Sequence, residues 1–446
     1  MNITLFTPEN RLHFGISAPY QSQSQGLMVV AALTPARHNV KIFDFSQSKI
    51  DFSIMPDLAG ITYTCSSRAA AFQLADQYRS LRVPVVLGGP EATAFPDEAQ
   101  AHADTVVIGE ADSVWEALLE DYECGVPKPR YQATVPAPID QHKYPRYDLY
   151  DNSRYFNVLP AYTSQGCPYR CAYCNYWKQH GAKRRVRPME EITNQIKFMK
   201  SVVDTSAFPL SINFTDDNIW CNPAFAKKLF RELKKLDISW WGQGSVTMDE
   251  ELFSLARESG CQIIFIGFES LNSENLKALN KKQNRVENYA KQIDLMHRAG
   301  LNVGGFFMVG LPYDCATVFD DLMDFIMAQR IETPIVNLFE PYRGTDFYNT
   351  YHWDGKEQCL HWEDTAPFLP VFTPEGITRK TFRQQFVKFS RALYADAALD
   401  HRLGNCGIPS IYFMNTGMKE VYNKPLMDAW IEKGQTLESR FSLVSP

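Results

Sequence analysis

The sequence is organised around Gly166-Cys167-Pro168-Tyr169-Arg170-Cys171-Ala172-Tyr173-Cys174, a segment that spaces three cysteines as Cys-x3-Cys-x2-Cys. Thiolates are soft ligands that suit iron–sulfur clusters or zinc. Three thiolates on one tight loop can bind three irons of a cubane 4Fe-4S cluster, which leaves the fourth iron without a protein ligand. An open coordination position is what a metal needs if it is to act on a bound molecule.

A structural zinc site is the alternative that these cysteines leave open. Zinc in structural sites takes four protein ligands, usually as two pairs. The sequence lacks a second pair near the segment, and His180 stands alone as a further residue of a ligand type. The ligand count therefore favours an iron–sulfur cluster over zinc.

The segment resembles the cluster-binding loop of the radical SAM superfamily. In that family the open iron binds the amino and carboxylate groups of S-adenosylmethionine (SAM), and one electron from the cluster cleaves the sulfonium to give a 5'-deoxyadenosyl radical. The resemblance implies that Cys167, Cys171 and Cys174 hold a 4Fe-4S cluster. It also implies that Tyr173, the aromatic residue before the last cysteine, lies against the adenine of SAM.

Length and composition fit an ordinary globular protein. The chain has 446 residues, of which 45% are hydrophobic and 22% charged, and its net charge is −6. The length suggests two or three domains, and the negative balance gives no sign of a nucleic-acid partner. The longest apolar run, residues 27–33, is too short to span a bilayer. Clustered cysteines without a secretion signal indicate a reducing compartment, the cytoplasm.

Residues 1–123 alternate short apolar runs with helical patterns, which predicts a doubly wound, Rossmann-like parallel sheet. Strands are expected at 2–6, 40–45, 58–64, 83–87 and 105–108, and helices at 26–37, 67–81 and 113–122. Ligands of such sheets bind beyond the carboxyl ends of the strands. The loops expected to line that site are 7–25, 63–67, 88–93 and 109–113.

The order of motifs in this region resembles the cobalamin-binding-type domain that precedes many radical SAM cores. The matching features are a first strand ending in Pro, a Gly-Leu helix start, a Gly-Gly-Pro turn and a Gly-Glu turn. Many such domains carry Asp-x-His-x-x-Gly, whose histidine binds cobalt, but residues 9–15 read Glu-Asn-Arg-Leu-His-Phe-Gly. The resemblance implies cobalamin as a candidate cofactor, and leaves His13 as either a cobalt ligand or a surface-loop histidine.

Residues 124–157 are rich in Pro and Tyr and predict an extended linker. Residues 158–345 then repeat strand and helix, which predicts a partial (β/α)6 barrel with its chemistry at the carboxyl ends of the strands. The expected strands are 159–164, 210–215, 239–246, 262–268, 302–309 and 335–339, and the expected helices are 189–203, 223–236, 249–259, 286–299 and 316–329.

Polar residues at the strand ends of this barrel also resemble radical SAM motifs. The resemblance implies that Asp216 and Asp217, after the second strand, face the SAM amino group, as a carboxylate facing an ammonium would. Gln243 lies in the third strand, where the family often has a charged residue that faces SAM. Glutamine can hydrogen-bond SAM but cannot form an ion pair with its carboxylate.

Later strand ends extend the resemblance. It implies that Glu269 and Ser270 hold the ribose or carboxylate of SAM, and that backbone at Gly310 meets the adenine. Pro341 begins a turn that is similar to the family's Pro-x-Pro-Gly-Thr, with Arg343 in place of the second proline. No catalytic residue is assigned from the sequence.

Residues 346–446 lose the alternation and predict a mainly helical C-terminal cap. Helices are expected at 379–399 and 419–433. The many aromatic residues of this region are expected to form a small helical core, with the lining of a substrate pocket as the alternative.

These patterns predict a radical SAM enzyme that modifies an unactivated carbon of a small-molecule substrate and takes electrons from a donor such as flavodoxin or ferredoxin. With cobalamin the expected outcome is methyl transfer. Without it, the outcome is a radical rearrangement, cyclisation or elimination. A non-catalytic iron–sulfur protein is a third hypothesis, which the strand-end carboxylates oppose because an electron carrier needs no SAM site.

Overall fold

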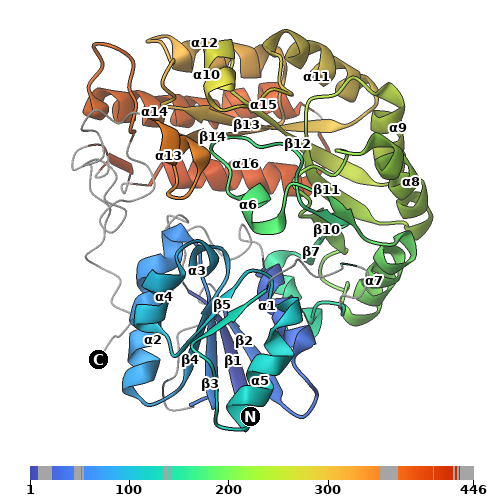
Figure 1. The fold of residues 1–446 in the computed structure, drawn as a ribbon. Helices are drawn as coiled ribbons and strands as arrows, with labels where there is room; N and C mark the ends of the chain where they lie inside the picture. The colour runs from blue at the N-terminus through green and yellow to red at the C-terminus, as the bar shows by residue number, and fades with distance from the viewer. Residues whose placement is uncertain are drawn as a thin grey trace. The chain divides into compact units, whose positions relative to one another are not determined.

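The computed structural model describes residues 1–8, 23–44, 52, 55–133, 139, 143–351, 370–404, 406–424, 427–428 and 431 (Figure 1). These residues form two compact units. The first unit contains the described residues up to Pro168 together with Asn175–Thr215. The second unit contains Tyr169–Cys174 and the described residues from Asp216 onward. The domain boundaries expected from the sequence, at 123, 157 and 345, stay predictions.

The first unit is built on a six-stranded parallel sheet with the order β2-β1-β3-β4-β5-β6. The strands are β1 (Asn2–Thr7), β2 (Asn39–Asp44), β3 (Leu58–Thr62), β4 (Val85–Gly88), β5 (Thr105–Ile108) and β6 (Arg130–Gln132). The expected doubly wound sheet is thereby confirmed. The sixth strand falls inside the stretch that was expected to be an extended linker.

Helices cover both faces of this sheet, as Figure 1 shows. One apolar core joins the sheet to α1 (Gln25–Leu33) and α5 (Trp115–Glu123), with Leu27 and Trp115 buried in it. The other core joins the opposite face to α2 (Arg68–Ser80), α3 (Pro90–Ala94) and α4 (Pro96–His102). Covering both faces explains why the strands are nearly all apolar.

A second six-stranded sheet has the order β14-β13-β12-β11-β10-β7, as expected for a partial barrel. Its strands are β7 (Val158–Ala161), β10 (Ser211–Phe214), β11 (Ser239–Gly244), β12 (Cys261–Glu269), β13 (Asn302–Val309) and β14 (Thr333–Leu338). β10 pairs with β7 in parallel, and β11 to β14 pair successively in parallel. In the first unit, β8 (Ser164–Gln165) and β9 (Arg185–Val186) form a small antiparallel pair around α6 (Tyr176–His180) and the start of the cysteine segment.

Helices connect these strands. They are α7 (Met189–Val202), α8 (Pro223–Leu233), α9 (Glu250–Glu258), α10 (Ser273–Ala278), α11 (Tyr289–Arg298), α12 (Val318–Ala328) and α13 (Asp346–Thr350). Side chains cap several of them: Asn222 accepts from Phe225 N at 3.1 Å and Asp249 accepts from Leu252 N at 3.0 Å. Such caps satisfy backbone donors that a helix leaves unpaired. The short α10 was not expected from the sequence.

The C-terminal region is helical, as expected. It contains α14 (Arg379–Leu393), α15 (Asp396–Leu403) and α16 (Pro409–Tyr422), so the helix expected over 379–399 is divided in two. Phe382, Phe386 and Phe389 are buried and form part of a helical core, whereas expected core residues at 353, 362 and 368 lie outside the described residues. Ile411 of α16 packs on Ile263 and Phe265 of β12, so this region covers one face of the second sheet. The later part of the helix expected over 419–433 lies mostly outside the described residues.

Candidate functional site

The cysteine segment begins at a glycine that no other residue can replace without strain. Gly166 has φ +86°, and a Cβ built on it would lie 2.5 Å from Lys183 O. After this turn, Cys167 N donates to Gly181 O at 3.3 Å. In the second unit, Cys174 N donates to Cys171 O at 3.1 Å, so a tight turn brings these two cysteines together. Cys171 is buried and Cys174 is half-buried.

The thiols of this segment fit the expected cluster by the chemistry of their donor set. Cys167, Cys171 and Cys174 form no disulfide. Among the described residues, no group of three or more His, Cys, Asp and Glu side chains is arranged to hold a single metal ion. His180, the extra ligand that a zinc site would need, is paired with Glu110 at 3.2 Å. Soft thiolates on one loop remain the ligands that an iron–sulfur cluster requires.

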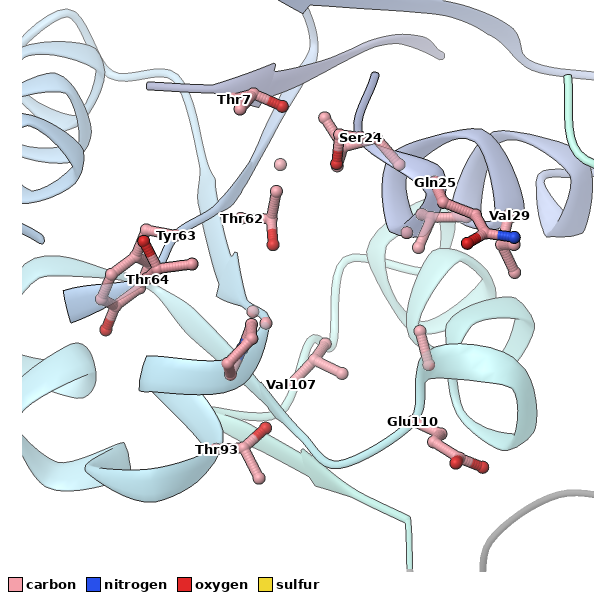
Figure 2. A pocket seen from close by; sticks show the side chains of 18 of the residues that line it. Thr7, Ser24, Gln25, Val29, Thr62, Tyr63, Thr64, Thr93, Val107 and Glu110 are labelled. Atoms are coloured by element: carbon pink, nitrogen blue, oxygen red, sulfur yellow. The ribbon is translucent and has the colours of Figure 1, made fainter. Parts of the chain in front are cut away.

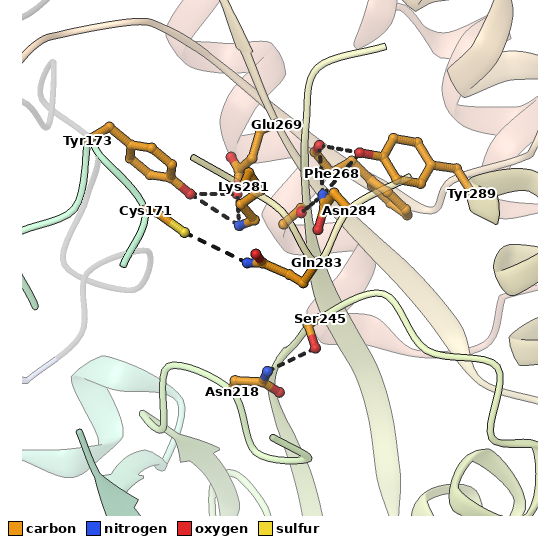
Figure 3. A network of polar contacts seen from close by, with 11 residues as sticks. Cys171, Tyr173, Asn218, Ser245, Phe268, Glu269, Lys281, Gln283, Asn284 and Tyr289 are labelled. Atoms are coloured by element: carbon orange, nitrogen blue, oxygen red, sulfur yellow. Dashed lines mark hydrogen bonds and ion pairs between the residues drawn. The ribbon is translucent and has the colours of Figure 1, made fainter. Parts of the chain in front are cut away.

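A buried ionic network lies beside the cysteine segment in the second unit (Figure 3). Lys281 Nζ lies 2.6 Å from Glu269 Oε1, and the Tyr173 hydroxyl donates to the same oxygen at 2.9 Å. Lys281 Nζ also lies 3.1 Å from the Tyr173 hydroxyl oxygen. The structure thus brings together Tyr173 and Glu269, which the sequence singled out, and adds Lys281, which it did not.

The charges of this network are held by their mutual pairing. Burial alone would lower the pKa of Lys281, but the Glu269 carboxylate raises it above its ordinary value. Burial also raises the pKa of the Tyr173 hydroxyl well above its ordinary value, and the Glu269 charge adds to that rise. The lysine is therefore an ammonium and the tyrosine a neutral donor. A cation and a carboxylate at this place suit a ligand such as SAM, which carries both charges.

Backbone geometry aims the Glu269 carboxylate. The pairing of β12 with β13 shifts register between Gly267 and Glu269, and Glu269 has φ +65°. A bulge of this kind re-aims a side chain, and a left-handed φ at a non-glycine residue is strain that the surrounding structure must support. The support comes from Asn284, whose Nδ2 donates to Gly267 O at 2.8 Å and to Phe268 O at 3.0 Å.

Ser270 and Gly310, two other expected SAM contacts, are linked through residues that the sequence did not single out. Asp314 Oδ2 accepts from Gly310 N at 2.7 Å and from Leu311 N at 3.0 Å. Asn275 Nδ2 donates to Asp314 Oδ1 at 2.8 Å and to Ser270 Oγ at 3.4 Å. Burial raises the pKa of Asp314 to about 6, against the lowering effect of these donors. Asp314 therefore fixes the turn that follows β13.

The remaining expected SAM contacts are placed individually. Asp216 is buried, Asp217 is half-buried and the Gln243 side chain is exposed. The Gln243 carbonyl accepts from Ile219 N at 2.9 Å, which ties the loop after β10 to β11. Pro341 is buried at the start of its turn. The roles that the resemblance gives to these four residues stay predictions.

The first unit contains a cavity of about 550 Å³ at the carboxyl ends of β1, β3, β4 and β5 (Figure 2). Hydroxyl groups line its mouth, from Thr7, Ser24, Thr62, Thr64 and Thr93. Described parts of all four expected loops contribute to the lining, so this sequence-based expectation is confirmed. His13 lies outside the described residues.

The cavity also has an apolar part that extends along the sheet. Leu5, Gly60, Val86 and Val107 line it, each one or two residues before a strand end, and three of them belong to the core that packs against α1 and α5. A larger residue at Gly60 would crowd this part of the lining, because a Cβ there would lie 2.8 Å from Leu5 Cδ2. A hydroxyl-lined mouth and an apolar slot fit cobalamin, whose corrin edge carries amides and whose nucleotide ends in a flat aromatic base.

One charged group in the lining is already neutralised. Arg185 Nη1 donates to Glu110 Oε2 at 3.1 Å, Arg185 Nη2 donates to Glu110 Oε1, and His180 pairs with the same carboxylate. Burial would raise the pKa of Glu110, but hydrogen bonds from His180 and Arg185 and their charges lower it to about 2. The negative charge of Glu110, one of two acidic residues in the lining, is therefore balanced by His180 and Arg185.

Comparisons with known proteins match both regions. The model of the radical SAM superfamily matches residues 162–326, and the model of the B12 binding domain matches residues 14–119. Bacteriochlorophyllide d C-8(2)-methyltransferase of Chlorobaculum tepidum is 30% identical over 354 residues, which are 76% of this chain and 78% of the relative. Bacteriochlorophyllide d C-12(1)-methyltransferase of the same organism is 27% identical over 431 residues, 94% of this chain and 93% of the relative.

A solved structure shares the fold. The radical SAM methyltransferase TsrM from Kitasatospora setae, with cobalamin and a 4Fe-4S cluster bound, superposes with a TM-score of 0.65 at 18% identity, covering 94% of this chain and 99% of that one. The expected cofactors, a 4Fe-4S cluster, SAM and cobalamin, are those of the two matched domains. The chain belongs to the radical SAM superfamily and carries a B12 binding domain in its N-terminal part.

Proposed function

We propose that this radical SAM enzyme is a cobalamin-dependent methyltransferase that adds a methyl group to an unactivated carbon of a small molecule. The observation that carries the proposal is the preformed cavity of about 550 Å³, most of whose lining lies in the stretch matched by the B12 binding domain. Two relatives that span most of the chain are methyltransferases by name, which supports the same activity. Protein interiors are close-packed, so an open cavity beside a glycine is not expected in a domain that binds no ligand.

The cysteine segment supplies the residues for the cluster, and the second unit supplies those for SAM. We infer that Cys167, Cys171 and Cys174 hold the cluster, which when bound supplies the electron that cleaves SAM. Lys281 offers an ammonium to the SAM carboxylate, and Glu269 offers an acceptor to its ribose hydroxyls. Asp314 holds the Gly310 turn in shape so that its backbone can meet the adenine. These residues bind and orient the cluster and SAM, and none of them transfers a proton.

The first unit supplies the residues for cobalamin, which when bound carries the methyl group. The threonine and serine hydroxyls of the mouth donate to or accept from the corrin amides, and the slot beside Gly60 takes the apolar base. Gly89 lets the backbone approach closely, since it has φ +95° and a Cβ there would lie 2.4 Å from Thr62 Oγ1.

Electron supply and location belong to the same proposal. The cluster has to receive electrons from a low-potential donor such as flavodoxin or ferredoxin. None of the nine described cysteines forms a disulfide, which fits the reducing cytoplasm. No described helix has the length and the apolar character needed to cross a membrane.

Labelled SAM tests the proposal. The anaerobically reconstituted enzyme, with iron, sulfide and hydroxocobalamin, is incubated with SAM that carries a deuterated methyl group, a low-potential reductant and candidate acceptors, beginning with chlorophyllide-type tetrapyrroles. The expected result is an acceptor with a deuterated methyl group, together with 5'-deoxyadenosine and S-adenosylhomocysteine. Formation of 5'-deoxyadenosine with a product that has gained no carbon would overturn methyl transfer in favour of rearrangement, cyclisation or elimination.

A further inference from the structure

The segment from Leu279 to Asn284, which follows α10, is docked against the cysteine segment. Four of its residues contact the cysteine segment. Leu279 O accepts from Ala172 N at 2.8 Å, and Asn280 Nδ2 donates to Arg170 O at 2.6 Å. Lys281 Nζ lies 3.1 Å from the Tyr173 hydroxyl oxygen, and Gln283 Nε2 lies 3.7 Å from Cys171 Sγ. The last contact is a hydrogen bond to sulfur, which is longer than one to oxygen. It reaches a cysteine that we assign as a cluster ligand (Figure 3).

Gln283 is fixed by its neighbours on both sides. Lys281 is anchored by its ion pair with Glu269, at 2.6 Å. Asn284 is buried and donates through Nδ2 to Gly267 O, Phe268 O and the Tyr289 hydroxyl, at 2.8, 3.0 and 3.0 Å. Asn280 has φ +51°, a left-handed conformation that asparagine tolerates better than most residues. The Gln283 amide is therefore held in place before any cluster binds.

We propose that Gln283 is a positioning residue that raises the reduction potential of the cluster by donating to the Cys171 thiolate. The inference rests on the proposed function, because it requires Cys171 to be a cluster ligand. Reduction adds one electron from the flavodoxin-type or ferredoxin-type donor to the cluster and breaks no bond. An N–H donor stabilises negative charge on a ligating sulfur, and it stabilises the more negative, reduced cluster most.

The consequence is a balance between two steps. A higher potential makes it easier for the cluster to accept the electron, and it lowers the driving force for passing that electron to SAM. Gln283 would therefore favour reduction by a biological donor at some cost in the rate of SAM cleavage. The outer hydrogen bonds of a cluster are one of the main means by which proteins set this balance.

The test is an EPR-monitored redox titration of the reconstituted full chain without SAM. Gln283→Leu removes the donor at similar size, and the ratio of reduced to oxidised cluster at a fixed potential should fall about tenfold, since a hydrogen bond to a charged acceptor is lost. A tenfold fall corresponds to a midpoint about 59 mV lower for one electron. The midpoint potential of Gln283→Glu should be lower still, because a carboxylate then faces the Cys171 thiolate. Gln262→Leu is the control, since the Gln262 amide donates to Gly260 O, away from the cysteine segment.

A second measurement keeps the proposal falsifiable if the variants hold too little cluster. Proton ENDOR of the reduced wild-type cluster, in water and in deuterated water, should show an exchangeable coupled proton, and glutamine labelled with 15N in its side chain should show a coupled nitrogen. Absence of the coupled glutamine nitrogen overturns the proposal, as does a Gln283→Leu midpoint equal to that of the wild type and of the Gln262→Leu control. If the wild type binds no cluster by iron analysis, the proposed function fails together with this inference. If both proteins are fully loaded with cluster and Gln283→Leu shows no shift of the midpoint potential, this inference alone is overturned.

Discussion

The cavity of the first unit and the ionic network of the second are built on opposite plans. The cavity is open space of about 550 Å³ lined by hydroxyls, glycines and aliphatic side chains, and the Glu110 carboxylate in its lining is neutralised by Arg185 and His180. The ammonium and carboxylate of the network lie 2.6 Å apart and have only small exposed fractions, 11% for the Lys281 side chain and 8% for that of Glu269.

The two regions are therefore suited to different kinds of ligand. A preformed cavity lined mainly by hydroxyl-bearing and apolar side chains suits a large ligand that binds by shape and apolar contact. A self-paired network suits a zwitterionic ligand, which has to replace one internal partner with its own charged group. Burying such charges is tolerable only while each has a partner, so the network is sensitive to the loss of a single group. The predictions below separate the two regions on this basis.

The largest effect is expected from Cys171→Ala. Removing one of three ligands should abolish the stable cluster, and SAM cleavage should fall to the level of the uncatalysed background. Corrin binding in the first unit should be retained, because the cavity lining does not include this residue. Iron content, 5'-deoxyadenosine formation and the corrin spectrum measure the three quantities. Cys315→Ala, at an exposed cysteine of the second unit, is the control, and an equal loss of cluster there would contradict the assignment.

Lys281→Met should produce the next largest effect. The substitution leaves the Glu269 carboxylate buried without its cation, which costs about 3 kcal/mol of unfolding free energy. SAM affinity should fall as well, measured by calorimetric titration of cluster-loaded protein. Lys282→Met is the matched control, because Lys282 is exposed on the same segment.

Two outcomes decide the case for Lys281. Adding Glu269→Gln to Lys281→Met should recover much of the lost unfolding free energy in urea titrations, because no unpaired carboxylate then remains buried. If Lys281→Met and Lys282→Met have equal stability and equal SAM affinity, the ionic network plays no part in the site.

Gly60→Val should act on the first unit alone. Even the Cβ lies 2.8 Å from Leu5 Cδ2, and the added methyl groups would occupy the apolar slot. We expect cobalamin affinity to fall about tenfold, and stability to fall by about 1–3 kcal/mol from overpacking. Corrin retained after equilibrium dialysis measures the first effect, and iron content should not change. Gly26→Ala is the matched control at the same cavity, because nothing lies within 4 Å of its added Cβ.

The smallest effect is a pH dependence at Asp314. Burial raises the pKa of this carboxyl to about 6 in the folded protein, above the ordinary value for an aspartate. The folded state then holds the proton more tightly than the unfolded chain. The contribution to stability is present at low pH and is lost as pH rises through about 6. Relative to Asp314→Asn, the wild type should lose about 1 kcal/mol of unfolding free energy between pH 5 and 7. A difference between wild type and Asp314→Asn that stays flat from pH 5 to 7 would contradict the assignment.

Much of the fold was predictable because buried parallel strands leave continuous apolar runs. Every expected strand of the first unit was found within a few residues, but β6 was missed, since Arg130-Tyr131-Gln132 offers only one apolar side chain in a proline-rich stretch. The break between α14 and α15 was also missed. It falls at Tyr394 and Ala395, without a proline or glycine to mark it, and tertiary packing decides it.

A contiguous motif in the sequence singled out the three cysteines, Tyr173 and Glu269, and the structure brings Tyr173 and Glu269 into contact, whereas their roles toward the cluster and SAM stay predictions. Lys281 and Asp314 were missed because their contacts form only in the folded chain. Lys281 contacts Glu269, from which a bulge and a short helix separate it in the sequence. Asp314 accepts hydrogen bonds from the backbone of the turn that precedes it. A lysine that lies 12 residues after a strand-end glutamate has no signature of its own in a sequence. The pKa values of two carboxyl groups also shift in opposite directions, to about 2 at Glu110 and to about 6 at Asp314. The direction of each shift depends on the partners around the group, which the sequence does not show.

The most direct test of the central claim is a visible absorption spectrum. The full chain is reconstituted anaerobically with iron, sulfide and hydroxocobalamin, desalted, and measured beside the Gly60→Val and Cys171→Ala variants. We predict that the wild type retains corrin bands together with the broad iron–sulfur absorption, that Gly60→Val loses mainly the corrin bands, and that Cys171→Ala loses mainly the iron–sulfur absorption. A wild-type spectrum with iron–sulfur absorption and no corrin bands would contradict a cobalamin-dependent methyltransferase.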